Sequence, residues 1–250
     1  MSQILQSLWI GPALSCMEVL SIRSFLAHGY RYHLYTYDEV ADLPAGAELR
    51  DAAEILPRSK VFRYREGGSF AGFSNFFRYR LLLERGGWWV DTDVVCVRPF
   101  DWGDEHVFAS ELAGSEDAVT TCVIKAPPGS PVMAYAWEVC RRSDPRRLLW
   151  GETGPALLGR AVREHDLEGH VRPPRTFCPL PYDAWRDLLD PARDTTLDPQ
   201  TRAVHLWHER WRSAEADKNG TYAGGCLFER LKARYLSDPN PDQRVDSGAS

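Results

Sequence analysis

The run of residues 72–99 constrains this chain most, because it predicts a helix, a glycine stop and a short strand that ends on two carboxylates. Nothing over 75–84 breaks a helix, and apolar residues recur there at the spacing of one helical face. Ser74 is the predicted N-cap. Gly86 and Gly87 supply the positive φ at which helices commonly stop. The run therefore predicts an α/β unit rather than an all-helical chain.

Two carboxylates, Asp91 and Asp93, lie between apolar runs with strand character over 88–90 and 94–97. In extended chain, residues i and i+2 point to the same side, so both carboxylates can face one point. Burying two carboxylates is costly unless a positive group joins them. Mg²⁺ or Mn²⁺ is the natural partner of such oxygen ligands. The alternative is a surface turn with two solvated aspartates.

The sequence around these aspartates resembles a family of glycosyltransferases. Its elements are Ser-Asn-Phe-Phe-Arg-Tyr at 74–79 and Leu-Leu-Leu-Glu-Arg-Gly-Gly-Trp-Trp-Val-Asp-Thr-Asp at 81–93. In order and spacing they are similar to the sugar-binding region containing a DXD motif. Initiating mannosyltransferases, α-1,4-galactosyltransferases, capsular polysaccharide transferases and glucosylating toxins share that region. The pattern usually has Asp where this chain has Asn75, which leaves the donor sugar open.

The resemblance is clear over 4–110 and weaker over 150–210. It implies an α/β chain with the GT-A fold, a Rossmann-like nucleotide-sugar-binding fold with a mostly parallel central sheet flanked by helices. We expect one domain over 1–236, with a donor-binding half at about 1–110 and an acceptor-side half at about 111–236. Residues 237–250 have the composition of a disordered tail.

The implied reaction moves a hexosyl group from a nucleotide diphosphate sugar to an acceptor hydroxyl, with retention of configuration. UDP is the expected nucleotide. The acceptor stays open among saccharides, glycolipids, proteins and small natural products, and polysaccharide biosynthesis is one setting. The metal, Mn²⁺ or Mg²⁺, would neutralise charge on the leaving nucleotide.

The resemblance also implies a catalytic set of Asp91, Asp93 and Arg78. Asp91 and Asp93 would hold the metal together with His205, which lies in a late Ala-Val-His-x-Trp segment, and His208 is the alternative. Arg78 would hold the donor's sugar or diphosphate, since a guanidinium fork suits such oxygens. For Arg78 the alternative is an ordinary surface arginine, and for the histidines a structural role.

Further donor contacts are predicted around this set. Trp9 ends the first strand in a Trp-Ile-Gly run that resembles the toxin-like members, in which the tryptophan stacks on uracil; the alternative is a core tryptophan. Tyr35 and Asp38 lie near the carboxyl end of the second strand, where doubly wound sheets bind ligands. The predicted donor set is Trp9, Ile10, Tyr35, Asn75, Arg78, Asp91, Thr92 and Trp207.

The acceptor side is predicted at a turn over 151–155, which resembles the Gly-Pro turn after the catalytic centre of the family. Glu152 and Thr153 are the candidate acceptor contacts there. Glu152 as a solvated turn residue is the alternative. The glycine-rich stretch over 62–69 either folds over the donor or is only a loop.

Periodicity and turn residues predict the remaining elements. The expected strands are 4–10, 32–37, 107–110, 119–125 and 203–208, and the expected helices are 15–27, 131–142, 156–164 and 226–236. Residues 38–60 read as a connection that carries one short helix near 51–56. In the 203–208 strand, alternation would place His205 and Trp207 on one side.

Composition excludes some classes. The 250 residues carry 30 basic and 35 acidic side chains, and the net charge of −5 argues against nucleic acid as the main partner. Six scattered cysteines without a C-x-x-C pair indicate reduced thiols in a cytosolic protein. No signal peptide or transmembrane segment is recognisable, so we expect a soluble, bacterial-type cytoplasmic protein, with peripheral membrane contact left open.

Two other functions compete with the transferase. A haloacid-dehalogenase-like Mg²⁺-dependent phosphatase also has a strand that ends in Asp-x-Asp, but that motif normally lies near the N-terminus. A non-catalytic sugar-nucleotide-binding protein would keep the fold without turnover. Intact Asp91, Asp93 and Arg78 favour the enzyme.

Overall fold

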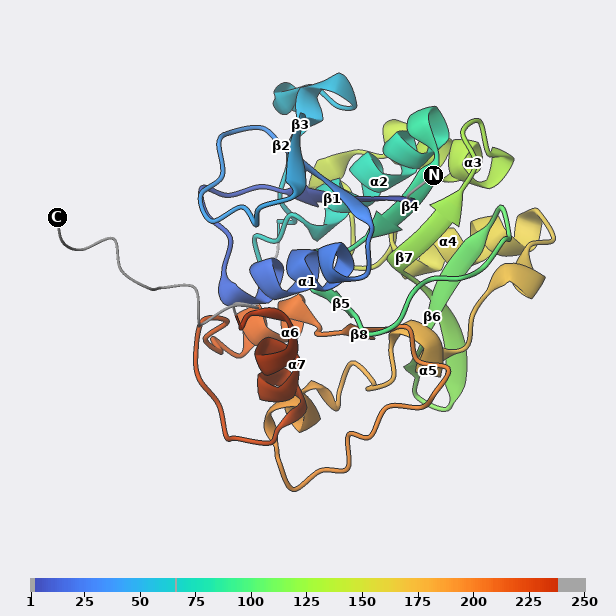
Figure 1. The fold of residues 1–250 in the computed structure, drawn as a ribbon. Helices are drawn as coiled ribbons and strands as arrows, with labels where there is room; N and C mark the ends of the chain where they lie inside the picture. The colour runs from blue at the N-terminus through green and yellow to red at the C-terminus, as the bar shows by residue number, and fades with distance from the viewer. Residues whose placement is uncertain (1–2, 66, 238–250) are drawn as a thin grey trace, which may run out of the picture.

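The structure, a computed structural model, describes residues 3–65 and 67–237, so nearly all of the predicted tail over 237–250 lies outside the described residues. A six-stranded sheet in the order β3-β2-β1-β4-β7-β6 forms the centre of the molecule, and β5 and β8 form a small second sheet (Figure 1). The strands are β1 Ile4–Trp9, β2 Arg31–Thr36, β3 Ala47–Asp51, β4 Gly87–Val90, β5 Val94–Cys96, β6 Val107–Ala113, β7 Glu116–Ala126 and β8 Ala203–His205.

Strand direction places the chain in the α/β class. β1 runs parallel to β2 and β4, and β2 runs parallel to β3, whereas β7 is antiparallel to both β4 and β6. Five of the six strands therefore point one way. The α/β class and the mostly parallel sheet predicted from the sequence are confirmed.

Helices cover both faces of the sheet. They are α1 Cys16–Ala27, α2 Ala71–Arg85, α3 Pro131–Arg142, α4 Pro155–Glu164, α5 Pro174–Phe177, α6 His208–Ser213 and α7 Leu227–Tyr235, with short 3₁₀ turns between them. α2, α3 and α4 lie on one side, and α1, α6 and α7 gather on the other (Figure 1). Each side holds its own apolar cluster.

The tandem tryptophans of β4 pack into the two apolar clusters, one on each face of the sheet. Trp88 belongs to the cluster under α1, and Trp89 belongs to the cluster under α2; each is 1% exposed. Successive side chains of a strand point to opposite faces, so Trp-Trp anchors β4 in both layers at once. The strand is thereby fixed where it delivers the aspartates that follow.

The glycine stop before β4 is confirmed. Gly86 is the C-cap of α2 with φ +64°, and a Cβ there would lie 2.5 Å from Pro128. Both the left-handed backbone and the close approach of Pro128 require glycine. The chain can therefore leave α2 and enter β4 within one residue.

Three boundaries were predicted wrongly. α2 begins at Ala71 with Phe70 as N-cap, so Ser74 lies inside the helix. Residues 38–60 contain the edge strand β3 as well as the short turn; the strand was missed because Ala47 and Leu49 alone give it little apolar pattern. The strand expected over 203–208 ends at His205, and a helix follows from His208.

Candidate functional site

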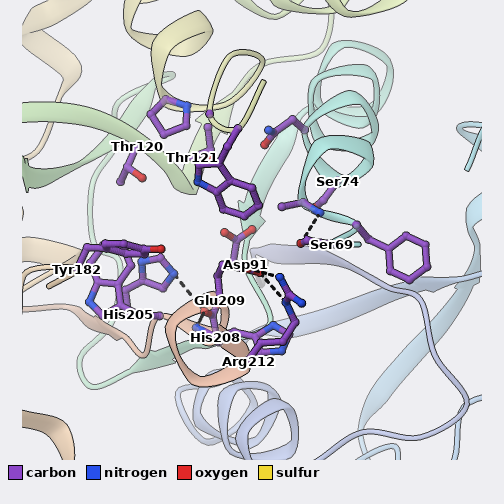
Figure 2. A pocket seen from close by; sticks show the side chains of 18 of the residues that line it. Ser69, Ser74, Asp91, Thr120, Thr121, Tyr182, His205, His208, Glu209 and Arg212 are labelled. Atoms are coloured by element: carbon purple, nitrogen blue, oxygen red, sulfur yellow. Dashed lines mark hydrogen bonds and ion pairs between the residues drawn. The ribbon is translucent and has the colours of Figure 1, made fainter. Parts of the chain in front are cut away.

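A cavity of about 870 Å³ opens at the carboxyl ends of β1 and β4, the edge at which open α/β sheets bind ligands. Its lining comes from segments far apart in the sequence. Lining residues lie within 8–10, 63–64, 67–71, 74–78, 89–93, 111–114, 120–121, 150–155, 181–183 and 205–212. Asp91 lies near the middle of the view in Figure 2, with His205 and Tyr182 on one side and Ser74 on the other.

Arg78 and Asp91 form one half of the polar floor. Arg78 Nη2 lies 3.1 Å from Asp91 Oδ1, and the guanidinium also donates to the Thr121 carbonyl at 2.6 Å and to Ser74 Oγ at 2.8 Å. Trp89 Nε1 donates to Asp91 Oδ1 at 2.8 Å. Arg78 is only 4% exposed. The surface-arginine alternative is thereby excluded, and a rigid fork faces the cavity beside a carboxylate.

Asp93 and His205 form the other half. His205 Nε2 lies 3.2 Å from Asp93 Oδ2, and the backbone N–H of His208 donates to the same oxygen at 2.7 Å. The antiparallel pairing of β5 with β8 sets His205 opposite Val94. His208 thus meets Asp93 through its backbone, whereas His205 meets it through its ring.

The two aspartates differ in electrostatics. Burial raises the pKa of Asp91 above its ordinary value, even though Arg78 opposes the rise. Burial also opposes ionisation of Asp93, but the charge and hydrogen bond of His205 together with His208 hold the pKa of Asp93 below its usual range. Burial lowers the pKa of His205, but Asp93 and Cys122 together raise it well above its ordinary value. Both shifts favour an imidazolium that faces a carboxylate.

These side chains fit a divalent cation. Asp91, Asp93 and His205 each offer one ligand atom, and the three atoms lie within 4.8 Å of one another. Two carboxylates and an imidazole suit Mn²⁺, and the carboxylates suit Mg²⁺. Arg78 offsets one negative charge, so the cation would meet a set of modest net charge.

Five other predicted donor contacts line the same cavity: Trp9, Ile10, Asn75, Thr92 and Trp207. The indole N–H of Trp9 has no hydrogen-bond partner among the described residues. Trp207 has a left-handed backbone at φ +62°, and its ring lies 3.9 Å from that of His205 between centroids. The two rings are therefore neighbours, although the strand that would have placed them on one side ends at His205.

Four predicted contacts do not reach the cavity lining. Tyr35 is 5% exposed and packs against Phe77, and Asp38 forms an exposed ion pair with Arg58 at 2.6 Å. Glu152 accepts a hydrogen bond from its own turn at Leu149 N, and Thr153 is 1% exposed. None of the four side chains lines the cavity, so we no longer assign them donor or acceptor contacts.

Sequence reasoning missed several lining residues, namely Tyr64, Glu111, Thr120, Thr121, Trp150, Tyr182, Glu209 and Arg212. Arg212 donates to the carbonyl of Gly67 at 2.8 Å and pairs with Glu209, so α6 holds the glycine-rich loop over the cavity. The polar stretch after His208 carries no pattern that separates a lining helix from a surface loop. Among these residues, Trp150 could have been found from the sequence, because it lies beside the glycine turn over 151–155. It is 54% exposed.

Comparison with known proteins decides which family these residues represent. Residues 29–109 match the family described as "Glycosyltransferase sugar-binding region containing DXD motif". The segment is a DXD glycosyltransferase region. It contains Asn75, Arg78, Asp91 and Asp93, so the resemblance predicted from 74–93 is confirmed. The phosphatase alternative is not retained, because the glycosyltransferase match covers both aspartates.

Two curated relatives of this DXD region are lactosylceramide 4-alpha-galactosyltransferases. Those of Mus musculus and Rattus norvegicus are 28% and 27% identical over an alignment of 101 residues, which covers 35% of this chain. The match spans 27% of the length of each relative.

Solved structures with similarity include the PaToxG glycosyltransferase, with TM-score 0.46, 14% identity and coverage of 66% of this chain and 70% of that one. The apo-form glycosyltransferase GlyE of Streptococcus pneumoniae has TM-score 0.45, 11% identity and coverage of 94% of this chain and 64% of that one.

Within residues 3–65 and 67–237, no helix combines the length and the apolar character needed to cross a membrane.

Proposed function

We propose that this chain is a metal-dependent glycosyltransferase that moves a hexosyl group from a UDP-linked donor to an acceptor hydroxyl with retention of configuration. One observation carries the proposal. The two aspartates of the DXD motif converge with His205 on the floor of a cavity, and the ligand atoms lie within 4.8 Å of one another beside the buried guanidinium of Arg78.

Asp91, Asp93 and His205 are the side chains that would hold Mn²⁺ or Mg²⁺. A divalent cation bound there supplies Lewis-acid neutralisation of a diphosphate. Arg78 adds a fixed positive group that the Thr121 carbonyl and Ser74 hold in place before any substrate arrives. Preorganised charge of this kind stabilises a leaving group without reorganisation at the moment of reaction.

The nucleotide is proposed to lie along the end of β1. Trp9 offers an aromatic face for a base, and its indole N–H, which has no partner within 3–65 and 67–237, offers a donor. Asn75, 6% exposed on α2, is proposed to bond a hydroxyl of the donor sugar. The domain is proposed to comprise a donor half through about residue 110 and an acceptor half after it.

The acceptor is proposed to meet Trp150 rather than Glu152 or Thr153. Trp150 lines the cavity, its side chain is 54% exposed, and it lies beside Tyr64 with ring centroids 5.1 Å apart. Sugars present apolar ring faces, and the exposed ring of Trp150, packed against the buried Tyr64, suits such a face. The proposed donor and acceptor contacts therefore line one cavity together with Asp91.

Turnover separates an enzyme from a non-catalytic binder of sugar nucleotides. UDP-hexoses are incubated with Mn²⁺ and a panel of saccharide acceptors, and released UDP is measured. We expect release with at least one donor, and a loss of at least about a hundredfold in Asp93→Asn, because that change removes a charged ligand but keeps the shape. Equal release by wild type and Asp93→Asn would refute the metal role, and donor binding without release would leave a binding protein.

A further inference from the structure

A second cluster of metal-binding side chains lies behind His205, away from the aspartates. Cys122 on β7 and Cys178 after α5 bring their sulfur atoms to 3.6 Å of each other, and Cys178 Sγ lies 3.9 Å from Nδ1 of His205. The two thiols and the imidazole offer ligand atoms that all lie within 4.8 Å of one another. The three residues are 1%, 2% and 8% exposed.

The spacing matches a tetrahedral site for a thiophilic ion. With Zn–S bonds of about 2.3 Å, two sulfurs of a tetrahedron lie about 3.8 Å apart, and a sulfur and an imidazole nitrogen lie slightly closer. The observed sulfur–sulfur and sulfur–nitrogen distances agree with these values to within a few tenths of an ångström. Soft thiolates together with imidazole select Zn²⁺ and similar ions over Mg²⁺ and Mn²⁺.

We propose that Cys122, Cys178 and His205 form a regulatory site for a thiophilic divalent cation such as Zn²⁺, and that filling this site withdraws His205 from the DXD centre. The cation reaches the cluster past His205, which lines the cavity. A water completes the coordination, and the thiol protons leave to solvent as the ion binds.

One imidazole cannot serve both sites at the same time in its neutral form. The ring faces the thiols through Nδ1 and Asp93 through Nε2, the latter at 3.2 Å. When Nδ1 binds a cation, the proton of neutral imidazole is on Nε2, which then donates to Asp93 instead of binding a metal. The thiol site rests on three side chains alone, and only its effect on the DXD metal rests on the proposed function.

The first test uses zinc X-ray absorption on the reduced, chelator-treated wild-type protein with one equivalent of Zn²⁺. We expect two sulfur ligands at about 2.3 Å and at least one nitrogen at about 2.0 Å. Cys178→Ala should lose one sulfur. Cys140→Ala, a thiol equally buried on α3, is the matched control and should keep both. A shell of only oxygen and nitrogen in the wild type overturns the site, whatever the variants do.

The second test measures Mn²⁺ binding by electron paramagnetic resonance with and without one equivalent of Zn²⁺. Zn²⁺ should weaken Mn²⁺ binding at least about tenfold in the wild type, because a ligand is lost, and should have no such effect in Cys122→Ala. Weakening that persists in Cys122→Ala comes from competition at the aspartates and overturns the regulatory role. Sulfur ligation of zinc in a protein that binds no Mn²⁺ would sustain the thiol site and refute the proposed function instead.

Discussion

Arg78 is held by four groups at once, which makes its shape as important as its charge. Its guanidinium meets Asp91, the Thr121 carbonyl and both oxygens of Ser74. A lysine would bring the charge but not the planar fork, and could not reach these partners together. The geometry at this residue therefore yields a sharp prediction.

Arg78→Lys should reduce turnover about a hundredfold, because the fixed positive group at the leaving diphosphate is misplaced, and should lower stability by about 1–3 kcal/mol through lost buried hydrogen bonds. Steady-state kinetics and thermal unfolding measure both. Arg80→Lys is the control on the same helix, since Arg80 makes a partly exposed ion pair with Glu84 at 2.7 Å. Wild-type turnover in Arg78→Lys would remove Arg78 from the site.

We expect His205 to make the proposed metal binding depend on pH. Burial lowers its pKa, but Asp93 and Cys122 together raise it well above the ordinary value, which favours the protonated ring. A metal must displace that proton, and Mn²⁺ affinity should therefore rise with pH, by up to about tenfold per pH unit, until the raised pKa of His205 is passed. Calorimetry in buffers of different ionisation enthalpy counts the released proton. A pH-independent affinity in the wild type, or an unchanged pH dependence in His205→Gln, would contradict this account.

At the scale of elements, Asp93 connects the segment before β5 to the segment after β8 through hydrogen bonds. Its carbonyl accepts from Leu206 N at 2.9 Å, and its carboxylate accepts from His208 N at 2.7 Å. The turn before β5 and the turn after β8 are thus fixed on one residue. The His205 ring can approach the aspartates because these hydrogen bonds hold β8 beside β5.

Local sequence predicted the first segment well and the second poorly. The α2–β4 run has a helical period, a glycine stop and an apolar strand, so each local signal agrees with the fold. After His205, alternation predicts continued strand, yet Trp207 adopts φ +62°, which is uncommon for a bulky residue. Its indole donates to the Leu180 carbonyl at 2.9 Å, and the next backbone N–H donates to Asp93. Contacts between distant segments fix this turn, and no local pattern contains them.

The same reason explains which predicted site residues lie outside the cavity lining. Trp9 and Arg78 were predicted from the chain around them and line the cavity. Tyr35 was predicted from its place near a strand end, but side-chain direction depends on packing against Phe77. Arg212 was missed because its role arises only from its contact with Gly67 in a distant loop.

At the scale of the molecule, the proposed donor and acceptor contacts in the cavity can be tested separately. Trp150→Ala should raise the acceptor KM about tenfold, equivalent to 1.4 kcal/mol of lost contact, while the KM for the donor stays unchanged. Leu149→Ala is the control, because Leu149 is more exposed at 73% but does not line the cavity. An unchanged acceptor KM in Trp150→Ala would move the acceptor elsewhere.

The central claim is that Asp91 and Asp93 bind a nucleotide diphosphate through a divalent cation. Calorimetry of UDP binding, with Mn²⁺ and with chelator, to wild type and Asp93→Asn tests this most directly. We predict binding by the wild type with Mn²⁺ that falls at least about tenfold with chelator, and weak, metal-independent binding by Asp93→Asn. Tight UDP binding that ignores both the chelator and the substitution would contradict the account.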